Sequence, residues 1–91
     1  MAHTYDNTPI IINGKGVSIH TKLAEVPVRN GVLVLVHRTP GWEPAGAGTR
    51  DVGEAWGALF YAKDGTTHGA WFKTPGEATE KHRRMVAFSN E

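Results

Sequence analysis

Five histidines are the side chains of this 91-residue sequence best suited to hold a metal ion or move a proton. They are His3, His20, His37, His68 and His82. No two of them stand in an H-x₃-H or H-E-x-x-H arrangement, the spacing that places two ligands on one face of a helix. We therefore expect no metal site.

Pairs of residues that could act as nucleophile and base are also weakly supported. The two serines, Ser18 and Ser89, lie outside any G-x-S-x-G sequence, and the chain has no cysteine. Tyr61 and His68 are expected to face each other across a hairpin, where aromatic packing explains the pair without proton transfer. The sequence therefore predicts a protein that is not an enzyme, with no catalytic residue and no cofactor.

The stretch from Glu54 to Phe88 predicts a β-hairpin followed by a helix. Asp64-Gly65 is the pair that a two-residue type I′ turn requires, because both of its positions need positive φ. Pairing the strands about that turn places Trp56 and Phe60 on one face together with Trp71. Both faces of the hairpin are apolar, so we expect both to be covered.

The helix has a clear start signal in Thr74-Pro75-Gly76-Glu77. Threonine at the N-cap, proline at the first helical position and glutamate three residues after the cap form a capping box. A narrow apolar stripe follows, made of Ala78, His82, Met85, Val86 and Ser89. These patterns predict a helix from Pro75 to about Phe88 that packs on one face of the hairpin.

The first half of the chain predicts strands separated by turns. Ile10–Ile12 and Val17–His20 are expected strands on either side of an Asn13-Gly14 turn. Leu23–Val28 contains Pro27, which predicts a short edge strand or an irregular connection. Val32–Val36 is aliphatic throughout, which is typical of a strand buried on both faces, so we expect it at the centre of the sheet.

Residues 39–53 are rich in glycine and proline and predict one long loop. Trp42 in this loop has two interpretations that the sequence leaves open. It either folds back over the core or is an exposed anchor for a partner, since tryptophan and arginine dominate interfaces. Arg50 is the neighbouring cation that could contribute to the second arrangement.

Together these segments predict the α+β class, with an antiparallel meander sheet of about five strands and one C-terminal helix packed on one face. Residues 1–8 are expected to be flexible, and residues 9–91 to form a single domain. One helix covers only one face of such a sheet. The other face must curl on itself, be covered by the 39–53 loop, or meet another chain, and we expect a homo-oligomer, most simply a dimer.

Composition narrows the class of protein further. The formal net charge is +1, which gives little of the positive field with which nucleic-acid-binding proteins attract phosphate. No apolar run has the length of a membrane span and no export signal is visible, so we expect a cytoplasmic protein. The frequent Gly, Ala, Pro and Val resemble the usage of GC-rich (actinobacterial) bacteria and their phages.

A tryptophan opening one strand, an Asp-Gly turn, and the run W-F-K-T-P-x-E-A into the helix form a further pattern. It resembles the strand–strand–helix unit of tyrosine-integrase arm-binding domains and ethylene-response-type DNA-binding domains over about a third of the chain. The resemblance implies nucleic-acid binding by the sheet face opposite the helix. The cations available for that role are Lys73, Lys81, Arg83 and Arg84.

These observations favour a small non-enzymatic protein-interaction module that binds a host protein or its own copy through an apolar sheet face and the 39–53 loop. The expected partner-binding residues are Trp42, Arg50, Trp56, Phe60 and Trp71. The alternative is a nucleic-acid-binding accessory protein. The sequence does not identify the partner.

Overall fold

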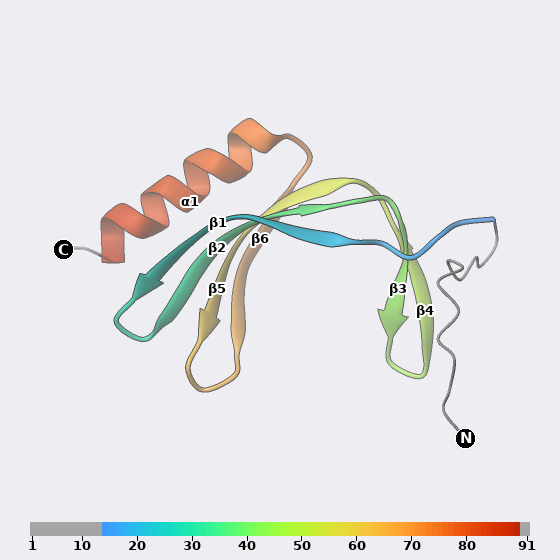
Figure 1. Cartoon of the computed structure of the whole chain (residues 1–91), viewed down its shortest axis with the longest axis horizontal. Helices are drawn as coiled ribbons and strands as arrows, with labels where there is room; N and C mark the ends of the chain where they lie inside the picture. The colour runs from blue at the N-terminus through green and yellow to red at the C-terminus, as the bar shows by residue number, and fades with distance from the viewer. Residues whose placement is uncertain (1–13, 90–91) are drawn as a thin grey trace, which may run out of the picture.

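The computed structural model describes residues 14–89 and contains six strands and one C-terminal helix in that part of the chain (Figure 1). The elements are β1 (His20–Val28), β2 (Gly31–Arg38), β3 (Gly41–Ala45), β4 (Gly48–Val52), β5 (Ala55–Ala62), β6 (Thr67–Phe72) and α1 (Pro75–Ser89). Four strands form an antiparallel sheet in the order β1-β2-β5-β6, and β3 and β4 form a separate two-stranded sheet, with one isolated bridge from Trp42 of β3 to Val17. The predicted α+β class, with one C-terminal helix on an antiparallel sheet, is confirmed.

The central position predicted for Val32–Val36 is also confirmed, because β2 lies between β1 and β5. Val34 and Val36 are only 3% and 4% exposed, as expected for a strand with an apolar residue at every position. The strand containing Pro27 lies at the edge of the sheet, although β1 is nine residues long rather than short. The strand expected at Ile10–Ile12 lies outside the described residues.

Residues 39–53 do not form a loop, and this prediction was wrong. β3 and β4 pair from Gly41 opposite Val52 to Ala45 opposite Gly48, and they extend the path of β2 and β5 beyond a bend (Figure 1). Gly46, one of the glycines that suggested a loop, lies in the tight turn between the two strands, where its φ is 59°.

The turn between β5 and β6 differs from the prediction by one residue. Ala62 N–H donates to the Thr66 carbonyl at 2.9 Å, so the loop holds three residues, Lys63 to Gly65. Gly65 has φ of 90°, as in hairpins that combine a type I turn with a bulge. The Asp64 carboxylate accepts from the Thr66 N–H at 2.9 Å and from its hydroxyl at 2.6 Å, which stabilises the three-residue loop.

That one-residue shift exchanges the faces of β6, because side chains alternate along a strand. Phe60 pairs with His68, and Gly57 pairs with Trp71. The predicted pairing of Tyr61 with His68 was therefore wrong, and the two side chains lie on opposite faces. The expected common face for Trp56, Phe60 and Trp71 was wrong for the same reason.

The helix begins and ends close to where the sequence placed it. Glu77 N–H donates to the Thr74 hydroxyl at 3.4 Å, and that hydroxyl donates to the Glu77 carboxylate at 3.0 Å. α1 lies across one face of the four-stranded sheet (Figure 1), and Ala78 and His82 of the predicted stripe are buried. Ala58 below the helix is fully buried, so small side chains on both elements allow a close approach.

Replacing Thr74 by alanine removes the acceptor for the Glu77 N–H, and we expect it to lower the free energy of unfolding by about 1 kcal/mol. Thermal and urea unfolding measure the change. Thr79→Ala is the matched control, because Thr79 is an exposed position inside the helix where alanine has the higher helix propensity. Equal stability of Thr74→Ala and the parent protein would contradict the assigned helix start.

Candidate partner-binding groove

The sheet has a helix-covered face and an open face. Strand register places these residues on the open face: Val32, Val34, Val36, Gly57, Leu59, Tyr61, Gly69 and Trp71. Val34, Val36 and Leu59 form a buried cluster with Val32 packed against it, although α1 lies on the other side of the sheet. Side chains of the open face itself therefore supply much of the cover.

Trp71 is the largest of these covering side chains. A Cβ atom built on Gly57 would lie only 2.9 Å from the Trp71 ring, so the indole lies directly against the backbone of β5. The Arg38 guanidinium is 4.7 Å from the ring centroid, within the range of a cation–π contact. The His20 ring meets Trp71 edge-on, with centroids 5.3 Å apart. Trp71 thus connects β6 to β1 and β2 across the open face.

The same region joins the four-stranded sheet to the β3–β4 hairpin. Glu43 of β3 accepts from Arg50 of β4 at 2.6 Å and lies 3.6 Å from His20 Nε2. The hydrogen bond from Arg50, with the positive charges of Arg50, Arg38 and His20, lowers the pKa of Glu43 below its ordinary value of 4.5. Glu43 therefore joins β3 to β4 through Arg50 and approaches β1 through His20.

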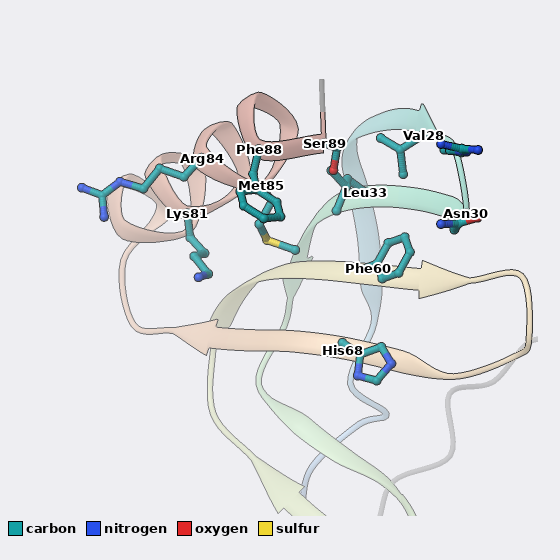
Figure 2. A pocket seen from close by; sticks show the side chains of 11 residues that line it. Val28, Asn30, Leu33, Phe60, His68, Lys81, Arg84, Met85, Phe88 and Ser89 are labelled. Carbon is teal, nitrogen blue, oxygen red and sulfur yellow. The ribbon is translucent and has the colours of Figure 1, made fainter. Parts of the chain in front are cut away.

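The helix-covered face contains a groove of about 720 Å³, between the C-terminal half of α1 and the turn ends of the strands (Figure 2). Its lining residues are Val28, Arg29, Asn30, Leu33, Phe60, His68, Lys81, Arg84, Met85, Phe88 and Ser89. The helix is close to the sheet at Ala78, whereas its later turns carry the larger side chains of Met85 and Phe88. The groove occupies this second part of the interface.

The side chains of the groove separate into an apolar floor and a basic rim. Val28, Leu33, Phe60 and Met85 form the floor, and Phe88, which is 77% exposed, lies at its border. Arg29, Lys81 and Arg84 form the rim. None of the described residues that line the groove is acidic. An open, mostly apolar groove with charged groups at its border is a candidate binding site.

His68 stands at the β6 side of the groove, and its ring orientation is fixed by the neighbouring turn. The Thr66 hydroxyl donates its one hydrogen to Asp64, so it can only accept from His68 Nε2, 3.0 Å away. The His68 ring also stacks on Phe60, with centroids 6.3 Å apart. Asp64 itself has a lowered pKa because the Thr66 hydroxyl and N–H bond to it.

His82 lies below the groove, where it contributes to structure. Its side chain is buried, and its Nε2 lies 3.2 Å from the Leu33 carbonyl oxygen, to which it donates. A buried imidazole with such a bond is satisfied, and it attaches α1 to β2. His20, His37 and His68 lie at three other places. The part of the chain that the structure describes contains no group of three or more metal-binding side chains.

The predicted partner-binding residues do not form one surface. Phe60 lies in the groove, and Trp56 lies on the same face, half-buried and stacked on His37 with centroids 5.1 Å apart. Trp71 lies on the open face. Trp42 and Arg50 lie on the β3–β4 hairpin, where Trp42 is half-buried and its N–H donates to the Gly16 carbonyl at 3.0 Å. Whether Trp42 anchors a partner stays a prediction.

The four cations expected to contact nucleic acid are also divided. Lys81 and Arg84 line the groove, whereas exposed Lys73 follows β6 before the helix. Glu80 accepts from Arg83 at 2.6 Å and from Arg84 at 3.1 Å, and these bonds lower the pKa of Glu80. One carboxylate therefore offsets part of the charge of this cluster.

Sequence reasoning missed most of the groove. Arg29, Asn30 and Leu33 come from the β1–β2 turn region, far from α1 in the sequence, and their approach to the helix depends on the strand order. One feature of the sequence could have indicated the groove: Met85 and Phe88 are large apolar residues three positions apart near the end of a helix.

No helix within residues 14–89 is long and apolar enough to cross a membrane. Comparison with protein-family models, curated proteins and solved structures found no match for this chain. Its function is therefore inferred from the groove and the surfaces next to it.

Gly57→Ala tests the packing of the open face. The added methyl group would collide with the Trp71 ring, and we expect a loss of about 1–3 kcal/mol in unfolding free energy and a shift of the Trp71 indole N–H resonance. Gly53→Ala is the control, because a Cβ there meets no atom within 4 Å. An unchanged indole resonance in Gly57→Ala would show that Trp71 does not lie on Gly57.

Glu43 predicts a pH dependence of stability. Because its pKa is lower in the folded protein than in the unfolded chain, its contribution is complete above about pH 4.5 and declines as the pH falls toward the folded value. The free energy of unfolding, measured with urea between pH 3 and 6, should change less steeply with pH in Glu43→Gln than in the parent. Glu54→Gln, which removes an exposed carboxylate, is the control. Parallel curves for Glu43→Gln and the parent would refute this role.

Proposed function

We propose that this protein is a non-enzymatic protein-interaction module whose groove binds an apolar, negatively charged segment of a partner protein. The observation that carries the proposal is the composition of the groove. Its floor is apolar, its rim holds Arg29, Lys81 and Arg84, and none of its described lining residues is acidic. A partner side chain in the floor gains from removal of apolar surface from water. Acidic groups of the partner that flank this side chain are attracted to the cations of the rim.

The exposure of Phe88 supports a partner of this kind. A large aromatic side chain that is mostly exposed at the border of an apolar groove is available to pack on an inserted side chain. Tyrosine, tryptophan, phenylalanine and arginine are enriched where proteins bind one another. Arg29 and Arg84 line the same groove.

Self-association through the groove is less favoured than binding of an acidic partner. A two-fold interface centred on the groove would bring the rim cations of two copies together, and like charges placed opposite each other oppose association. The homodimer expected from the sequence stays a prediction, which light scattering at high micromolar concentration tests. The cytoplasmic location and the bacterial or phage source also stay predictions.

A pair of labelled peptides tests the proposal directly. We expect the fluorescein-labelled peptide Glu-Glu-Leu-Phe-Glu-Glu to bind and the peptide Lys-Lys-Leu-Phe-Lys-Lys not to bind. Lys81→Glu should weaken binding of the acidic peptide about tenfold, since attraction becomes repulsion at a partly exposed site. Lys22→Glu on β1 makes the same change of net charge away from the groove and should leave the affinity within about twofold of the parent.

Two results would contradict the proposal. Equal binding of the acidic and basic peptides would remove the role of the rim. Equal losses in Lys81→Glu and Lys22→Glu would indicate attraction by overall charge only. Tighter binding of a 20-nucleotide single-stranded DNA than of the acidic peptide, with a steep loss on adding salt, would instead favour the nucleic-acid alternative.

A further inference from the structure

We infer that the partner segment binds in an extended conformation, as an additional strand on the outer edge of β6, with alternate side chains directed into the groove. This inference rests on the proposed function and specifies how the groove is used. It depends on three features: the unequal protection of the two sheet edges, the direction of the β6 backbone groups, and the position of Lys81.

The two edges of the four-stranded sheet are protected to very different degrees. β1 carries a Lys22–Glu25 ion pair, Pro27 and a register irregularity at Leu23, all of which hinder the addition of another strand. β6 has the sequence Thr-His-Gly-Ala-Trp-Phe, without lysine, acid or proline, and it pairs with β5 in unbroken register. Of the two edges of the four-stranded sheet, β6 is therefore the one that is suited to accept a strand.

The hydrogen-bonding pattern shows which β6 backbone groups face outward. Ala62 and Thr66 form a hydrogen-bonded pair at the turn. Because such pairs alternate along antiparallel strands, His68, Ala70 and Phe72 bond to β5, whereas Thr67, Gly69 and Trp71 direct their N–H and C=O groups to the outer edge. All three outward-facing residues are exposed. An extended segment next to β6 would pair with these groups.

The side chains of such a segment would alternate between the two faces of the sheet. Those on the helix-covered face would lie beside His68 and Ala70. Figure 2 shows that Lys81 extends from α1 toward the sheet, at the same groove that His68 lines. Ala70 is small and leaves room for a neighbouring side chain. The favoured partner is therefore an extended segment in which apolar and acidic residues alternate on one face.

The probe is the peptide Thr-Leu-Thr-Glu-Thr-Leu-Thr-Glu, which presents leucine and glutamate on one face when extended. We expect it to slow amide hydrogen exchange at Thr67, Gly69 and Trp71 at least tenfold, with smaller changes at the amides that already bond to β5. In an added strand only every second peptide amide faces β6. N-methylation of those amides should abolish binding, whereas N-methylation of the other amides should leave the peptide affinity within about threefold of the unmodified peptide.

Proline at position 67 provides a test from the protein side. The Thr67 N–H faces outward, so Thr67→Pro removes one edge donor without removing a bond to β5. We expect at least a tenfold loss of peptide affinity in Thr67→Pro and less than a twofold change in Thr67→Ala. Circular dichroism and thermal unfolding check that both variants remain folded. If Thr67→Pro does not fold, the N-methylated peptides still give the answer.

The outcomes separate this inference from the proposed function. If the peptide binds with sensitivity to Lys81→Glu but protects none of the β6 edge amides, the groove is used and the strand arrangement is wrong. If the peptide protects the β6 edge but is insensitive to Lys81→Glu, the groove has no part and both proposals fail. The β6 edge amides could also exchange slowly without peptide, and more slowly as the protein concentration rises. In that case a second copy occupies the edge, and the inference is overturned.

Discussion

The contact between Trp71 and Gly57 covers part of the face of the sheet that the helix does not cover. One helix covers only one face of a four-stranded sheet, and β2 directs apolar side chains to both: its leucines to the helix-covered face and its valines to the open face. The indole lies flat on β5 because Gly57 has no side chain, and Arg38 and His20 then pack on that indole. Val34, Val36 and Leu59 are consequently buried without a second layer.

The Trp71 ring also links the core of the four-stranded sheet to the β3–β4 hairpin, through His20. His20 contacts Trp71 on one side and Glu43 on the other, so the apolar cover of the sheet continues into a charged junction. Helix and hairpin are thus held by different kinds of interaction. The helix packs through small buried side chains and the His82 bond, whereas the hairpin meets its neighbours through backbone hydrogen bonds of Trp42 and the Glu43–His20 approach.

Local signals in the sequence predicted the elements well and their relative placement less well. The capping box at Thr74 and the aliphatic run of β2 specify structure through neighbouring residues alone, and both predictions were correct. The β5–β6 turn depends on a competition between two-residue and three-residue loops, and the Asp64 side chain decides it by bonding to Thr66. The resulting shift of one residue moved Trp71 to the opposite face.

The groove could not be predicted from local sequence signals either. Its residues come from the β1–β2 turn, β5, β6 and the end of α1, and only the strand order brings these four regions together. Phe60 was identified from its residue type, and Lys81 and Arg84 as part of a basic cluster. Nothing in their spacing showed that they would share a site with Leu33 or Arg29.

The difference between the two edges of the four-stranded sheet also limits the size of an assembly formed by strand pairing at those edges. Open-ended growth of a sheet requires two receptive edges on every copy, so that each added molecule offers a new one. Here β1 hinders addition through Pro27, the Lys22–Glu25 pair and its irregular register. Pairing through β6 would consume the receptive edge, and the product would be a closed pair rather than a fibre. The protein can in this way present one edge strand for pairing without forming open-ended fibres through its four-stranded sheet.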